Sequence, residues 1–182
     1  SSSFKDIFYN PGYQKILDQF FSVEITQKFL EADDITHQKY LEVKSNVLKS
    51  LFHFGAKNYD KEMMKYVIDL NIDNKSKFLT ECLVMNKTVK TAAQYLINQD
   101  LRFLSSIIGE IATLDPEILK ENLDGSLTIL DLLVDKGYKE ELEMLFKLSN
   151  QENISRNYKS ELLIKASWLG NKSIVKLLIN EG

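Results

Sequence analysis

The chain has 182 residues, of which 44% are hydrophobic and 27% are charged, a globular composition for one compact domain or a short repeat array. Its formal net charge of −3 argues against a nucleic-acid binder, because phosphate binding needs a basic surface. With only 7 Gly and 2 Pro, the chain lacks the turn residues that a β-sandwich or barrel needs, so helices are expected.

The N-terminal stretch PGYQKILDQFFSVEITQKFLEADD, residues 11–34, predicts two short helices. Apolar residues recur there at helical spacing: Tyr13, Ile16, Leu17, Phe20 and Phe21, followed by Ile25, Phe29 and Leu30. Residues 33–46 are expected to form the connection to the next unit. Residues 1–46 are therefore interpreted as a helical N-terminal cap or a divergent repeat.

A helix pair is expected in KSLFHFGAKNYDKEMMKYVIDLNID, residues 49–73. Phe52, Gly55 and Ala56 mark the buried face of its first helix, and Asp60 is a suitable N-cap for the second. The second helix carries an apolar stripe formed by Met63, Met64, Val67 and Ile68.

The middle of the chain is less regular. Residues 77–98 predict another helix pair, with Ala92, Ala93, Leu96 and Ile97 on the stripe of its second helix. The apolar stretch from Leu101 to Leu114 then predicts one extra or elongated helix, which Pro116 ends. The sequence leaves open which neighbouring helix this one packs against.

Two C-terminal stretches, residues 124–146 and 161–182, repeat one pattern of a short helix, a glycine and a second amphipathic helix. The glycines, Gly137 and Gly170, lie 33 residues apart. Glycine readily adopts the left-handed conformation that ends a helix, and Asn171 is a suitable cap for the helix that follows. The apolar positions after the glycines also correspond: Leu142 to Val175, Leu145 to Leu178 and Phe146 to Ile179.

These features resemble the ankyrin-repeat family over roughly residues 47–182, most clearly over residues 124–182. The family's Thr-Pro-Leu-His opening corresponds to Thr128-Ile129-Leu130-Asp131, Ser50-Leu51-Phe52-His53 and Glu161-Leu162-Leu163-Ile164, and its hairpin tip to Asp124-Gly125. The resemblance implies an all-α, ankyrin-like solenoid of stacked antiparallel helix pairs, with an irregular N-terminal cap and one extra or elongated helix in the middle. Residues 47–182 would form the repeat array, expected to be an excerpt of a longer protein.

In the resembling family, one face of the first helices lines a concave groove that binds other proteins. The resemblance therefore implies a non-catalytic protein–protein interaction module with a protein partner. The residues that it places on or beside this face are Phe54, Lys57, Asn58, Leu127, Leu132, Asp135, Lys136, Lys165, Trp168 and Leu169. Trp168, the only tryptophan, is the expected anchor. Its alternative role is to pack on a neighbouring loop or on a further repeat.

No catalytic residues, metal site or cofactor are expected. His53 falls at the family's helix-opening histidine, which implies a ring that hydrogen-bonds the backbone, and His37 is expected to be solvated in the connector. Cys82 is interpreted as a buried thiol, since no base or helix N-terminus lies near it in the sequence. Two histidines and one cysteine, widely spaced, make a poor zinc set. No nucleic-acid partner and no small-molecule substrate are expected.

Other interpretations stay open at this level. The degenerate repeats, rich in Asn, Ile and Lys, also fit a host-targeting module of a bacterial effector protein that acts in the cytosol of a host cell. A helical accessory domain of an enzyme would need a ligand pocket between helices. A tetratricopeptide or HEAT-like array stays open for the N-terminal half. A cytoplasmic location without a membrane span is expected, because no window approaches 18 uninterrupted apolar residues.

Overall fold

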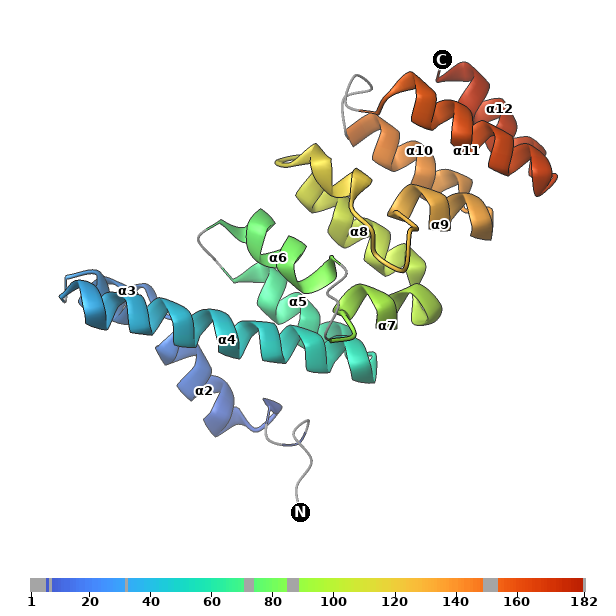
Figure 1. Ribbon diagram of the computed structural model, residues 1–182. Helices are drawn as coiled ribbons and strands as arrows, with labels where there is room; N and C mark the ends of the chain where they lie inside the picture. Colours follow the sequence, from blue (N-terminus) through green and yellow to red (C-terminus); the bar gives the residue numbers. More distant parts are fainter. Residues whose placement is uncertain are drawn as a thin grey trace. The chain divides into compact units, whose positions relative to one another are not determined.

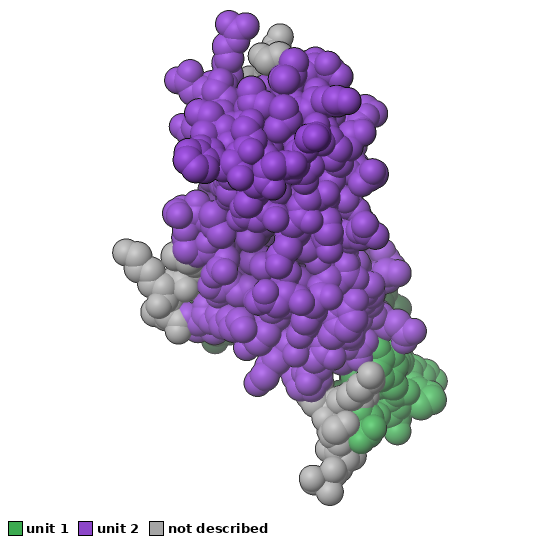
Figure 2. Space-filling view, turned by 90° about the vertical axis from the view of Figure 1, so that its right-hand side faces the viewer, with its two compact units in different colours: residues 1–51 green, residues 52–182 purple. Residues whose placement is uncertain are grey.

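The computed structural model describes residues 6, 8–31, 33–70, 74–84, 89–148 and 154–181. All regular elements in these ranges are helices, accompanied by one isolated β-bridge between Asp124 and Leu127. The chain divides into two compact units, residues 1–51 and residues 52–182 (Figure 2). None of the described helices is both long and apolar enough to cross a bilayer.

Unit 1 contains α2 (Pro11–Phe20), α3 (Val23–Leu30) and the larger part of α4 (Asp34–Asn58). The two short helices expected near the N-terminus are thus confirmed. Tyr40 of α4 holds them together: its ring stacks on Phe29 with centroids 4.3 Å apart, and its hydroxyl donates to the Phe20 carbonyl at 3.1 Å. Aromatic packing and the hydrogen bonds of the Tyr40 hydroxyl, to the Phe20 carbonyl and with the Thr26 hydroxyl, therefore define this small core.

The expected connection over residues 33–46 is wrong, because these residues form the start of α4. Asp33 caps the helix by accepting the Thr36 N–H at 3.0 Å, and neither Gly nor Pro occurs between Asp34 and Gly55. His37 accordingly lies in a helix, with its Nδ1 atom 3.1 Å from the Phe29 carbonyl oxygen. The polar residues belong to the exposed side of a long helix rather than to a loop.

Unit 2 contains the end of α4 and the remaining helices (Figure 1). In chain order they are α5 (Lys61–Asp69), α6 (Lys75–Leu83), α7 (Ala92–Gln99), α8 (Leu101–Ala112), the 3-10 helix η1 (Pro116–Lys120), α9 (Ile129–Lys136), α10 (Lys139–Leu148), α11 (Arg156–Trp168) and α12 (Lys172–Asn180).

Three turns between successive helices share one backbone geometry. Gly137 and Gly170 have φ values of 74° and 67°, and Tyr59 adopts the same left-handed conformation with φ 54°. In each turn the residue after the left-handed one donates its N–H to the carbonyl five residues earlier. The distances are 2.8 Å after Tyr59, 2.9 Å after Gly137 and 3.0 Å after Gly170. This bond is the hallmark of the Schellman motif. The three helix pairs inferred around these positions therefore share their turn.

In the part of unit 2 from α8 to α12, like helices pack beside like. The helices that open each pair, called first helices here, are the end of α4, α7, α9 and α11. The helices that close each pair, called second helices, are α5, α8, α10 and α12. α9 packs against α11, α8 packs against α10, and α10 packs against α12. Side chains link the earlier pairs: the His53 ring meets Tyr95 edge-on, and Arg102 binds Glu141 at 2.9 Å.

The helix expected from Leu101 is present as α8, but α8 pairs with α7, so α6 is the helix left outside the pairs. α7 and α8 are joined by Asp100 alone, which ends one helix and caps the next by accepting the Phe103 N–H at 2.9 Å. α8 packs against both α7 and α10, as a second helix does, whereas α6 packs against α7 and α8. The apolar stripe of residues 92–97 thus belongs to a first helix.

Apolar side chains from both helix layers form the interior of unit 2. Members without appreciable exposure include Phe52, Met63, Leu96, Leu104, Leu133, Leu145, Phe146, Leu162 and Ile174. Burying one such side chain stabilises the fold by about 1.5–3 kcal/mol relative to leaving it exposed. No single helix pair encloses these residues, so neighbouring pairs supply one another's core.

Candidate protein-binding face

Trp168 lies on the outer side of α11, the most C-terminal of the first helices. Leu162 and Ala166 bury the side of α11 that faces α12, whereas Ile164 and Trp168, four residues apart, lie on the opposite side. Trp168 is 86% exposed, Ile164 58% and Leu169 53%. Ile164 and Trp168 therefore face solvent on one side of α11, and Leu169 is exposed just after its end.

Equivalent positions on the other first helices are occupied by polar residues. Counting from the shared turns and caps, Trp168 corresponds to Asp135 in α9, Asn98 in α7 and Lys57 in α4, and all four side chains are exposed. We call the side of the first helices that carries these four residues the first-helix face. Trp168 is the apolar member of this row.

A polar cluster joins α9 and α11 beside Trp168. The Lys165 ammonium lies 3.0 Å from the Asp135 carboxylate and 3.4 Å from that of Asp131. Tyr158 donates its hydroxyl to Asp131 at 3.0 Å, and its oxygen also lies within hydrogen-bonding distance of the Thr128 hydroxyl. Burial, with the Asp131 carboxylate nearby, raises the pKa of Tyr158 above its usual value. These bonds fix the side-chain positions.

Leu132 is placed in the core, with 5% of its surface exposed. It corresponds to Lys165 one repeat later, and Lys165 reaches back to the preceding first helix. A side chain at position 132 that extends in the same direction is directed toward the helices that precede α9, where an apolar side chain is buried. Leu132 therefore offers no surface to a partner, and Lys136 and Asp135 are the exposed residues at this end of α9.

Leu127 closes a tight turn before α9. Leu123 donates its N–H to the Leu127 carbonyl at 2.9 Å, and Gly125 supplies a left-handed φ of 60° at the tip. Asp124 accepts a hydrogen bond from the Gln94 side chain at 3.2 Å, which places the turn beside α7. Leu127 itself is half-buried, so it contributes only part of its surface.

The α4 end of the face is polar. Phe54 is half-buried, Lys57 and Asn58 are exposed, and Asn58 donates its side-chain amide to the Phe54 carbonyl at 2.9 Å.

Sequence reasoning missed Asn98 of α7, because α7 was taken for a second helix. The available signal was the capping box at Thr91 and Gln94, which matches the one at Thr128 and Asp131.

The residues considered for chemistry lie apart from one another in the fold. His53 contacts the Tyr95 ring at 5.4 Å, and the backbone hydrogen bond expected of it is absent among the described residues. Burial, together with the nearby Lys57 charge, lowers the pKa of His53. Cys82 of α6 is half-buried. Within the described ranges, no three His, Cys, Asp or Glu residues gather in a way that would hold a metal ion.

Comparison of the chain with protein-family models, with curated proteins and with solved structures gave no match.

Proposed function

We propose that residues 52–182 form an ankyrin-like, non-catalytic module that binds a protein partner through the first-helix face. The observation that carries this proposal is the exposure of Trp168 beside Ile164 and Leu169, in a row whose other members are polar. The shared turns, the capped first helices and the Asp124–Leu127 turn support the ankyrin-like assignment.

A tryptophan is a favourable anchor because it buries a large, rigid surface at little entropic cost. Trp168 contributes nothing to the core, since 86% of its surface faces solvent. The expected partner therefore presents an apolar hollow or segment that covers Trp168 and Ile164.

The neighbouring polar cluster suits the same role. Lys165 and Tyr158 hold the Asp131 and Asp135 carboxylates in place, so their positions are set before a partner arrives. A pre-ordered surface loses little conformational entropy when it docks. The cluster would therefore orient the partner, while the apolar residues supply most of the affinity.

Site-specific photo-crosslinking tests the proposal. The photoreactive residue p-benzoylphenylalanine is placed at Asn98 or Trp168 on the first-helix face, and at Ile179 on α12 as the matched control. We expect one defined adduct, the same from positions 98 and 168, in cells that naturally produce the chain. Equal labelling from position 179, or no defined adduct from positions 98 and 168, would refute the proposal.

A further inference from the structure

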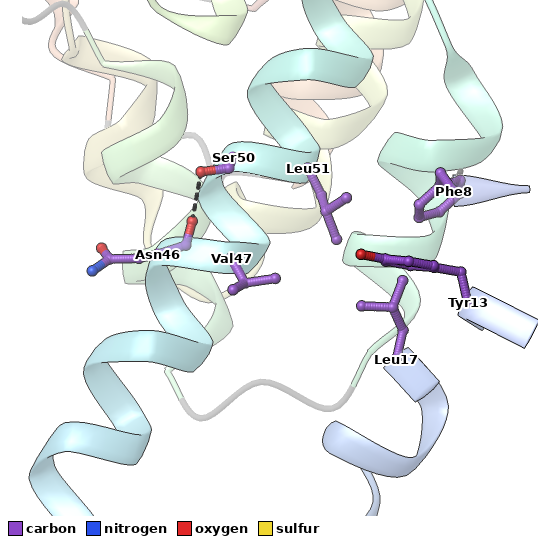
Figure 3. Close-up of a pocket in the computed structure, with 7 residues that line it drawn as sticks. All are labelled: Phe8, Tyr13, Leu17, Asn46, Val47, Ser50 and Leu51. Atoms are coloured by element: carbon purple, nitrogen blue, oxygen red, sulfur yellow. Dashed lines mark hydrogen bonds between the residues drawn. The ribbon is translucent and has the colours of Figure 1, made fainter. Parts of the chain in front are cut away.

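Unit 1 contains an apolar pocket that the first-helix face does not involve. It has a volume of about 330 Å³ and lies between the N-terminal residues and α4 (Figure 3). Phe8, Tyr13 and Leu17 form one side, and Val47 and Leu51 of α4 form the other.

The wall opposite α4 is held by local hydrogen bonds. Asn10 caps α2 by accepting the Gly12 N–H at 2.9 Å, and Pro11 fixes the first helical residue. Gln14 donates its side-chain amide to the Phe8 carbonyl at 2.6 Å, which ties Phe8, two residues before the cap, to the first turn. Phe8 is only 3% exposed, so its ring is a fixed part of the wall.

Among the described residues that line the pocket none is charged, so its occupant should be neutral. In Figure 3 the Tyr13 hydroxyl points toward α4, and it has no hydrogen-bond partner among the described residues. The Ser50 hydroxyl, by contrast, already donates to the Asn46 carbonyl at 2.8 Å, and the Asn46 amide points away from the pocket. Tyr13 is therefore the polar group available to a ligand inside an apolar lining.

The volume indicates the size of the ligand. Ligand pockets begin at about 300 Å³, and an apolar cavity of about 150 Å³ holds one benzene ring. The present pocket has roughly twice that cavity volume, which suits two fused rings. We propose that this pocket binds a small, uncharged, two-ring-sized apolar molecule that carries one group able to hydrogen-bond the Tyr13 hydroxyl.

The experiment uses 2-naphthol, an uncharged two-ring molecule with one hydroxyl, as the probe at neutral pH. The whole chain is labelled at its Ile, Leu and Val methyl groups, and spectra are recorded during titration. We expect saturable shifts at Leu17, Val47 and Leu51, and none at Ile164 or Ile179. Absence of saturable shifts at the pocket residues, or equal shifts at the exposed residues of α11 and α12, would overturn the proposal.

A pair of matched variants locates the binding. Val47→Phe fills the pocket and should weaken the binding of 2-naphthol at least about 10-fold. Val43→Phe makes the same change one turn earlier on α4, at a half-exposed side chain outside the pocket, and should leave the affinity unchanged. Equal affinities of the two variants would contradict the assignment. Shifts of the same methyl groups on dilution without probe would assign the pocket to a second copy of the chain instead.

Discussion

Lys165 and Asp135 form an ion pair 3.0 Å long that joins α11 to α9. The same ammonium lies 3.4 Å from the Asp131 carboxylate, so one lysine bridges two carboxylates a turn apart on the neighbouring first helix. The position equivalent to Lys165 in α9 is Leu132, which is buried. Two positions 33 residues apart thus carry an ion pair between helices in one case and a buried leucine in the other.

Replacing Lys165 by Met should lower the free energy of unfolding by about 1 kcal/mol. The substitution keeps most of the aliphatic chain but leaves the Asp131 and Asp135 carboxylates without their shared cation. Urea unfolding measures the change. Lys147→Met is the control, because Lys147 forms its ion pair within α10, with Glu143 at 2.7 Å, and should leave stability nearly unaltered. Equal effects of the two variants would show that Lys165 does not link the helix pairs.

The two glycine turns should respond differently to alanine. Gly170→Ala forces a Cβ into a left-handed conformation but meets no neighbouring atom within 4 Å, so we expect a loss of about 1 kcal/mol of stability. At Gly137 the Cβ would also come within 2.9 Å of the Asn171 side chain, which caps α12 by accepting the Ile174 N–H.

Gly137→Ala should therefore cost about 1 kcal/mol more than Gly170→Ala, because it strains the turn and disturbs the cap of the next pair. Thermal or urea unfolding of both variants tests this order. A smaller loss for Gly137→Ala than for Gly170→Ala would mean that the two turns do not meet as described.

The ionised carboxylate of Asp100 makes the free energy of unfolding depend on pH in the acidic range. Burial alone would raise the pKa of its carboxyl, but hydrogen bonds from Lys61, the Phe103 N–H and Tyr59 outweigh burial and hold it at about 2. Because the folded pKa lies below the unfolded value, the stabilisation is complete above about pH 4 and is lost as pH falls through 2.

Asp100→Asn should remove this pH dependence. We expect the variant to be less stable at neutral pH by about 1 kcal/mol, less than the full shift implies, because solvent screens this partly exposed group. The difference should shrink between pH 4 and pH 2 in urea titrations. Tyr59→Phe, which removes one of the three bonds, should show a smaller loss. A difference that stays constant down to pH 2 would contradict the role of the ionised carboxylate.

The helix turns were predictable from sequence because their requirements are local. Gly137 and Gly170 supply the left-handed conformation, and Asp60 and Asn171 accept the N–H groups that a helix start leaves free. Tyr59 shows the limit of such reasoning, since it adopts a positive φ without being glycine. The Tyr59 hydroxyl donates to the Asp100 carboxylate at 2.7 Å, although the two residues are 41 positions apart in the sequence. No local sequence pattern indicates this hydrogen bond.

The assignment of α7 and α8 was less accessible because apolar periodicity identifies a buried face but not the helix that covers it. Ala92 and Leu96 look the same in a first or a second helix. The capping box at Thr91 and Gln94, and packing between pairs such as Tyr95 on His53, distinguish the two roles.

The sequence indicated which positions correspond between the first helices, but not which side chains at those positions are exposed. A spacing of 33 residues relates Leu132 to Lys165 and Asp135 to Trp168. Whether a side chain at these positions is exposed depends on the preceding pair, as the enclosed Leu132 shows.

The affinity of the Trp168→Ala variant for the partner identified by crosslinking tests the first-helix face most directly. We expect a loss of about 2 kcal/mol or more, roughly 30-fold in Kd, while Ile179→Ala on α12 binds like the unaltered chain. Circular dichroism and urea unfolding confirm that both variants keep the fold. Unchanged affinity of a folded Trp168→Ala variant would contradict the central claim that the first-helix face is the binding surface.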